Sequence, residues 1–245
     1  MGEAPWWRGP MLAWDTESTG VDVETDRIVT AALVWIDPGK PVTSKHHLVD
    51  PGVEIPAAAT AIHGITTDRV QAEGRQPEAV LEEVAVGLVN ALAAGVPLVG
   101  MNVCYDFTLL DRELRRHGLR TLADRTGGDP ISPVVDALVL DRYVAPRRRG
   151  SRRLTALCEV WGVPMDGAHD ANFDALGAAR VAWKIAYKNS PIGRMSLGDL
   201  HALQVRERAR QQAELRAYFD RIGRQHDGMP GDWPMLPYTR QEVLT

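Results

Sequence analysis

Asp15 and Glu17 are two carboxylates one residue apart, at the end of the apolar run 11–14. On a β-strand, side chains alternate between the two faces, so both acids would point the same way, just before Gly20 permits a turn. Adjacent like charges repel each other, and such a pair at the rim of a sheet predicts a cation between them. Hard oxygen ligands of this kind suit Mg²⁺ or Mn²⁺.

Two further acids stand where sheet strands would lead into helices. Asp106 follows the short apolar run 97–101 and opens the segment 106–117, which we expect to be a helix. Asp174 lies in the first turn of a helix expected over 171–187. Strand ends and the helix starts that follow them meet at one edge of an α/β sheet, so we expect the four carboxylates to converge there. Four acids need neutralisation, which predicts two divalent ions.

His169 precedes Asp174 by five residues, so the two would point apart on one continuous helix. We therefore expect His169 on the loop before the helix, beside the metal-bound water. An imidazole has an ordinary pKa of about 6.5 and takes up a proton near neutral pH. His169 is thus the predicted general base.

The elements that must position these residues alternate in a recognisable order. Residues 27–36 and 44–49 are rich in β-formers, with the turn 37–41 between them, and with the first strand they predict three antiparallel strands. We expect a polar connection over 52–70, a helix over 77–94, a buried strand over 97–101 and helices over 106–117, 134–144, 154–161 and 171–187. This order predicts an α/β fold with a mixed sheet.

The composition shifts after residue 190. A long charged helix is expected over 197–222, followed by a Pro, Gly and Trp tail over 228–237. We therefore divide the chain into a domain over 1–190 and a helical extension with its tail over 191–245.

Bulk properties limit the class of protein. The chain has 245 residues, 44% of them hydrophobic, and a net charge of -4, which argues against a passive nucleic-acid binder but not against an enzyme with a local cleft. Two cysteines and no apolar run of membrane-spanning length lead us to expect a cytoplasmic protein without a secretory signal or membrane contact.

Three motifs stand in a fixed order along the chain: Asp-x-Glu-x-Thr-Gly at 15–20, Asn-x-x-x-Asp-Phe at 102–107 and His-x-Ala-x-x-Asp at 169–174. In this order they resemble the exonuclease motifs of the DEDDh superfamily, which includes the proofreading ε subunit of bacterial DNA polymerase III. The likeness covers roughly residues 10–187, including the segment 62–66. The likeness implies an RNase H-like mixed sheet flanked by helices. Residues 191–245 lie outside the likeness.

The resemblance also implies a chemistry and its residues. Asp15, Glu17, Asp106 and Asp174 would hold two Mg²⁺ or Mn²⁺ ions, with His169 as general base. The terminal nucleotide would contact Thr16, Ser18, Thr19, Gly20 and His63, with Asn102 and Phe107 nearby. The reaction would be hydrolysis of 3'-terminal phosphodiesters of single-stranded or frayed DNA, releasing nucleoside 5'-monophosphates.

Alternatives remain open at this level. The same motifs fit a 3'-5' exoribonuclease, because they bind phosphate and metal and do not read the sugar, and a non-catalytic nucleic-acid-binding adaptor would also keep the fold. His63 has a second interpretation as a loop-stabilising residue.

Three other features have a structural interpretation that we favour. Asp136 is expected to cap a helix, and most of the arginines in 147–153 are expected to be solvated. Gln212, Leu215, Tyr218 and Phe219 have the spacing of a sliding-clamp-binding box, but packing of a helix face is favoured, and a polymerase or clamp partner is unsupported.

Overall fold

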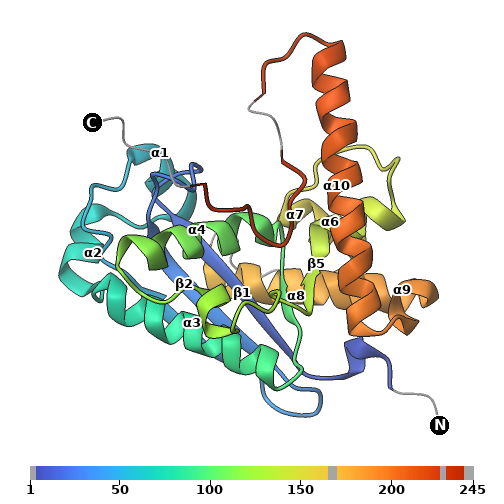
Figure 1. The fold of residues 1–245 in the computed structure, drawn as a ribbon, viewed down its shortest axis with the longest axis horizontal. Coiled ribbons are helices and arrows are strands. Elements are labelled where there is room, and N and C mark those ends of the chain that lie inside the picture. Colours follow the sequence, from blue (N-terminus) through green and yellow to red (C-terminus); the bar gives the residue numbers. More distant parts are fainter. Residues whose placement is uncertain (1–3, 165–169, 227–229, 240–245) are drawn as a thin grey trace.

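A five-stranded mixed sheet forms the centre of the computed structural model, which describes residues 4–164, 170–226 and 230–239 (Figure 1). Its strands are β1 (Met11–Ser18), β2 (Ile28–Ile36), β3 (Thr43–Leu48), β4 (Leu98–Gly100) and β5 (Val134–Asp136). Their order across the sheet is β3-β2-β1-β4-β5, with β1, β2 and β3 antiparallel and β4 and β5 parallel to β1. The predicted α/β fold with a mixed sheet is confirmed.

Helices cover both faces of this sheet. They are α1 (Ala57–His63), α2 (Thr67–Glu73), α3 (Pro77–Ala93), α4 (Val103–Arg116), α5 (Leu122–Arg125), α6 (Ala137–Val144), α7 (Leu154–Trp161), α8 (Ala171–Lys188), α9 (Ser190–Arg194) and α10 (Leu197–Arg221), after a 3₁₀ turn at Trp6–Arg8. The helices α3 and α4 lie on one face, and α8 lies on the other (Figure 1).

Alternation along β1 sends its side chains into two separate cores. Leu12 and Trp14 pack with α3 and α4, whereas Met11 and Ala13 pack with α6, α7 and α8. Burying apolar area on both faces is the main force that fixes this strand's register. The same alternation directs Asp15 toward α8 and Thr16 toward α4.

Two predicted elements are wrong. Residues 134–144, expected as one helix, form the strand β5 and then the helix α6, with the change at Asp136. A continuous apolar run does not distinguish a buried strand from a buried helix, and here pairing with β4 selects the strand. Residues 52–70, expected as a polar connection, contain α1 and the start of α2, which bury Ala59 and Val70 against Val29.

The C-terminal part packs on the sheet domain through α10 and the segment 230–239. Gln204 of α10 accepts a hydrogen bond at Oε1 from the backbone N–H of Asp136 (2.7 Å). Its Nε2 donates to the carbonyl of Val134 (3.0 Å). The segment 230–239 returns from α10 across α4, where Leu236 donates its N–H to Thr108 (Figure 1). No helix within the described ranges is long and apolar enough to cross a membrane.

Candidate active site

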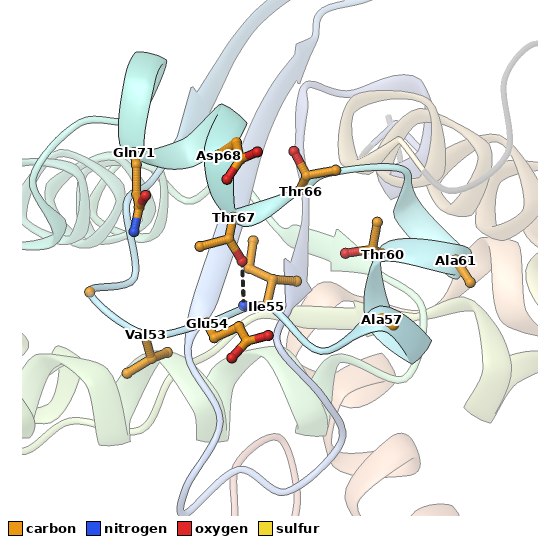
Figure 2. Close-up of a pocket in the computed structure, with 11 residues that line it drawn as sticks. Val53, Glu54, Ile55, Ala57, Thr60, Ala61, Thr66, Thr67, Asp68 and Gln71 are labelled. Carbon is orange, nitrogen blue, oxygen red and sulfur yellow. Dashed lines mark hydrogen bonds between the residues drawn. The ribbon is translucent and has the colours of Figure 1, made fainter.

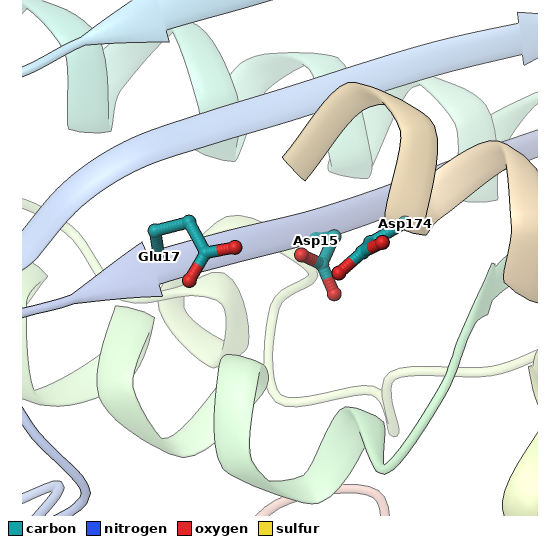
Figure 3. Close-up of side chains that lie close together, drawn as sticks. All are labelled: Asp15, Glu17 and Asp174. Atoms are coloured by element: carbon teal, nitrogen blue, oxygen red, sulfur yellow. The ribbon is translucent and has the colours of Figure 1, made fainter. Parts of the chain in front are cut away.

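Three carboxylates meet at the end of β1. Asp15 and Glu17 point from β1 toward α8, and Asp174 projects from the first turn of α8 (Figure 3). One oxygen of each lies within 4.8 Å of the others, and all three residues are partly exposed. Of the four carboxylates predicted to converge, these three lie close to one another.

Burial and the repulsion between neighbouring carboxylates shift the pKa values of this cluster. Burial, followed by the negative charges of Asp106 and Asp174, raises the pKa of Asp15 well above its ordinary value. Burial and the charge of Asp174 raise the pKa of Glu17 to about 8. Each carboxylate thus disfavours ionisation of its neighbours, and the oxygen-only donor set fits a divalent cation such as Mg²⁺ or Mn²⁺.

Asp106 reaches the cluster from the opposite side of β1. It is 5% exposed and lies in the first turn of α4, where it accepts hydrogen bonds from the N–H (3.1 Å) and hydroxyl (2.7 Å) of Thr16. Burial raises its pKa to about 7, although the Thr16 bonds oppose the shift. Asp106 therefore adds negative charge to the cluster while staying outside its group of three mutually close carboxylates.

His169, the predicted general base, lies outside the described residues. The described residue that follows it, Asp170, caps α8 by accepting the N–H of Asn172 (2.9 Å). Its charge further raises the pKa of Glu17, after Asp174 and Asp106.

A pocket of about 600 Å³ adjoins the acids. Its walls come from the end of β1, from α1 and from the start of α4, and they include six of the predicted substrate contacts: Thr16, Ser18, Thr19, Gly20, His63 and Asn102. The strip 16–20 therefore forms one side of the pocket, and Glu17 joins the pocket to the acid cluster.

Tyr105 is a pocket residue that the motifs did not reveal. Its hydroxyl donates to the carbonyl of Gly20 (2.6 Å) and lies 2.6 Å from the hydroxyl of Ser18. Burial raises the pKa of the Tyr105 hydroxyl to about 12, so this hydroxyl stays protonated near neutral pH. Its position inside the 102–107 motif was the available signal, because one turn of α4 places it beside the strip 16–20.

His63 and Phe107 differ in how they relate to this pocket. His63 lines it and also accepts the N–H of Ile65 at Nδ1 (3.1 Å), so it contacts both the pocket and its own loop. Phe107 has no exposed surface, and its ring packs 4.7 Å from that of Trp14. The expected position of Phe107 beside the substrate is not supported, because successive helical positions turn it into the core beneath β1.

Asp136 is a structural acid, as predicted. Its carboxylate caps α6 through the N–H groups of Leu138 and Val139. The same carboxylate accepts from the N–H groups of Asn102 (3.0 Å) and Val103 (3.2 Å) at the start of α4. These bonds hold Asn102 in the left-handed conformation, with φ of 59°, in which it lines the pocket.

A larger hollow of about 840 Å³ lies between α1 and α2 (Figure 2). Thr67 holds its inner wall by accepting the N–H of Ile55 (2.9 Å). Glu54 and Asp68 are the charged side chains along its lining. It shares α1 with the 600 Å³ pocket but contains none of the clustered acids, so its volume alone does not make it the chemical centre.

Known proteins are similar to this chain in sequence. A family model described as exonuclease, RNase_T, matches residues 12–182. The DNA polymerase III PolC-type of Lacticaseibacillus paracasei is 28% identical over 164 residues, which cover 67% of this chain and 10% of that protein. The chain thus spans about a tenth of the length of this curated relative.

Solved structures share the fold. Exonuclease I of E. coli in complex with a dT13 oligonucleotide has a TM-score of 0.61 at 21% identity, covering 75% of this chain and 42% of that chain. The zinc-bound form of the E. coli exonuclease I complex with single-stranded DNA has a TM-score of 0.62 at 22% identity, covering 75% and 41%. Since the family model spans most of the chain, the protein belongs to the RNase_T exonuclease family, and its motifs are those of the DEDDh-type 3'-5' exonucleases.

Proposed function

We propose that this chain hydrolyses the 3'-terminal phosphodiester of single-stranded or frayed DNA and releases nucleoside 5'-monophosphates. The observation that carries the proposal is the convergence of the carboxylates of Asp15, Glu17 and Asp174 beside the 600 Å³ pocket. DNA is favoured as the substrate because an exonuclease I of the same fold was solved with a dT13 oligonucleotide.

The acids would hold the metal. Asp15, Glu17 and Asp174, with Asp106 behind β1, supply carboxylate oxygens for two Mg²⁺ or Mn²⁺ ions. When bound, such ions supply Lewis-acid chemistry, which lowers the pKa of a water and offsets charge on the leaving 3'-oxygen. The zinc-bound form of exonuclease I supports binding of a divalent metal by this fold.

The chain's own residues would orient the strand end and move the proton. The strip 16–20 and Asn102 form the surface against which the terminal nucleotide would lie. Tyr105, bonded to the carbonyl of Gly20, keeps this strip in place. His169 would take the proton from the attacking water at an imidazole nitrogen, an assignment that rests on its place in the third motif.

One experiment tests polarity, sugar preference and activity together. The protein is incubated with Mg²⁺ and with matched DNA and RNA oligonucleotides labelled at the 3' or the 5' end. We expect 5'-labelled DNA to give a ladder of shortening products, and 3'-labelled DNA to release a labelled mononucleotide at once. A faster RNA ladder would make the protein an exoribonuclease, and intact substrates in every lane would leave the adaptor function.

A further inference from the structure

A stripe of aromatic and basic side chains runs along the outer face of α8, the helix that carries Asp174. At 3.6 residues per turn, six positions of α8 share an arc of about 100° on this face. We call these residues the outer stripe: Phe173, Leu176, Arg180, Trp183, Lys184 and Tyr187. Ala175, Ala182 and Ile185 occupy the opposite side of α8 and pack on the sheet. The exposed face of such a helix is ordinarily polar, so aromatic rings on it are unusual.

The exposed rings stand at the two ends of the outer stripe. Phe173 is 39% exposed and directly precedes Asp174 of the acid cluster. Tyr187, at the other end, is 61% exposed, and the ring of Trp183 stacks on it with centroids 5.2 Å apart and planes 5° apart. Trp7 packs at nearly a right angle to both of these rings. These contacts fix the Tyr187 ring while most of it stays open to solvent, so it offers a preformed surface for stacking.

The basic groups on this face have no acidic partner. Within the described ranges, Arg8, Arg180 and Lys184 form no ion pair with a carboxylate. Arg8 lies 5.0 Å from the ring centroid of Trp7, and Lys184 lies 5.8 Å from that of Trp183. A contact between a cation and a ring leaves the positive charge in place. Unpaired cations beside open rings therefore complement an anionic chain that carries flat rings.

The outer stripe differs from the basic loop 147–153, where part of the charge serves the fold. Arg148 and Arg152 pair with the fully buried Asp141, which also accepts from Nε1 of Trp161 (2.9 Å). These two arginines are therefore structural, contrary to the expected solvated loop, whereas the other arginines of the loop are exposed as expected.

The exposed ring on α10 also differs, because the charges beside it are paired. Tyr218 is 46% exposed, so the packing expected for this helix face is wrong at Tyr218, though confirmed for the buried Gln212. Arg210, which lines the same small hollow as Tyr218, pairs with both Glu207 and Glu214. This ring therefore offers an anion less than the outer stripe does.

The outer stripe begins beside the acid cluster. Carboxylate oxygens of Glu17 and Asp174 lie within 4.8 Å of each other; Glu17 also lines the 600 Å³ pocket, and Asp174 stands on the first turn of α8 (Figure 3). The cluster therefore lies between the pocket and α8, and a strand with its last nucleotide in the pocket would continue past the cluster toward α8. From residue 173 to residue 187, α8 rises by about 21 Å, the length of about six stacked nucleotides.

We propose that the outer stripe binds the single-stranded DNA substrate on the 5' side of its terminal nucleotide, with Arg180 and Lys184 on backbone phosphates and with Phe173 and Tyr187 stacked against bases. This inference rests on the proposed function and names a second contact surface for the same substrate. Phosphate contacts supply most sequence-independent affinity for nucleic acid, and an aromatic face accepts any base.

Binding is measured in the Asp15→Asn background, which prevents hydrolysis, with fluorescent dT oligonucleotides of about 3 and about 16 nucleotides, below and at the top of known single-strand site sizes. Arg180→Gln combined with Lys184→Gln should weaken binding of the long strand about tenfold and that of the short strand less than about twofold. The salt slope for the long strand should fall by about 1.4, as for two lost phosphate contacts. Arg180→Lys combined with Lys184→Arg keeps both charges and should retain the affinity.

Tyr187→Leu tests the stacking, because it removes the ring and keeps an apolar side chain. It should weaken binding of the long strand about fivefold or more, as for the loss of one stacked base. Tyr187→Phe keeps the ring and should bind like the unmodified protein. Unchanged long-strand affinity in Tyr187→Leu would contradict the stacking role.

The matched control is Lys45→Gln combined with Arg120→Gln, which removes two exposed charges on the α3 and α4 side of the sheet. Equal weakening by this control, or equal weakening of both strand lengths by the α8 variants, would overturn the inference. Sedimentation of the DNA-free protein adds a third check, because a dimer that Tyr187→Asp dissociates would assign the outer stripe to a second copy of the chain and overturn the inference as well. Because binding is read without turnover, an inactive wild-type protein that shows this length dependence would remove the proposed hydrolysis and leave the outer stripe as a DNA-binding surface.

Discussion

Two groups of acids stand at the same edge of the sheet and have opposite surroundings. Asp136, at the end of β5, is 1% exposed and faces backbone N–H groups from two helices. Asp15, two strands away on β1, faces Asp174 and Glu17. One site presents donors to a carboxylate, and the other presents more carboxylates.

The contrast shows what separates a structural acid from a functional one. A buried carboxylate with enough donors stabilises the fold, and one without them favours a proton or a cation. Asp141 belongs with Asp136, because Arg148, Arg152 and Trp161 surround it. In the acid cluster, by contrast, neighbouring carboxylates raise the pKa values of Asp15 and Glu17. Four substitutions test this difference.

Asp15→Ala should have the largest effect. Removing a central ligand of the proposed metal site should lower hydrolysis by about 10³-fold or more, equivalent to several kcal/mol of lost charge stabilisation. The fold should persist, because the mutation also removes a repulsive charge. Rates on labelled single-stranded DNA and thermal melting measure the two effects.

Asp68→Ala is the control for Asp15→Ala, since Asp68 is an exposed acid lining the larger hollow on the other side of α1. Its activity should match that of the unmodified protein. Retained turnover in Asp15→Ala would contradict the assignment of Asp15 as a metal ligand.

His169→Ala should lower the rate by about 10²-fold with metal affinity preserved, as expected for loss of a general base. His46→Ala, at an exposed position of β3, is the matched control. The measurement is the rate between pH 6 and 9 beside a metal titration. Full rate across that range in His169→Ala would place the base elsewhere.

Asp136→Ala should destabilise the protein by about 2 kcal/mol, because it orphans buried N–H groups at the starts of both α4 and α6. Asp129→Ala, an exposed acid, should stay within about 0.5 kcal/mol. Chemical denaturation measures both. If the two variants unfolded alike, the distinction between structural and functional acids drawn here would fail.

Glu17→Gln should have the smallest effect. Unlike the other substitutions, which lower activity or stability, it should raise the stability of the metal-free protein. In metal-free protein the pKa of Glu17 is about 8, against an ordinary value of 4.5. Between these two pH values the folded state holds a proton that the unfolded chain has released, so stability falls as pH rises. Glu17→Gln should remove this part of the fall and stabilise the metal-free protein at pH 8 by about 1 kcal/mol.

The control for Glu17→Gln is Glu54→Gln, an exposed glutamate on the rim of the larger hollow. Its free energy of unfolding should follow the unmodified pH profile. A Glu17→Gln protein that lost stability at pH 8 in the presence of chelator would contradict the repulsion assigned to the cluster.

Much of the site was predictable, because alternation and helix-start positions are local properties. Asp15 and Glu17 share a face through the period of two, and Asp174 follows from its place in the first turn of α8. That Asp106 bonds Thr16 on the opposite side of β1 was not predictable, since it depends on which face of the sheet α4 covers.

Long-range contacts account for what was missed. Nothing near residue 136 shows that β5 pairs with β4, so 134–144 read as one helix. Likewise Trp233 is 7% exposed and packs beside His201, a contact that the tail's composition does not encode. Propensity and periodicity describe a segment, and its partner is set by tertiary structure.

The crossing of α4 by the segment 230–239 also has a consequence during synthesis. Leu236 bonds Thr108, 128 residues earlier in the chain, and Arg112 donates to the carbonyls of Leu236 and Pro237. At about 5 to 20 residues per second, a ribosome takes about 6 to 25 s to make the intervening chain. The helix that carries Asp106 thus waits on the nascent chain for its covering segment, long after the strands it packs against have been made.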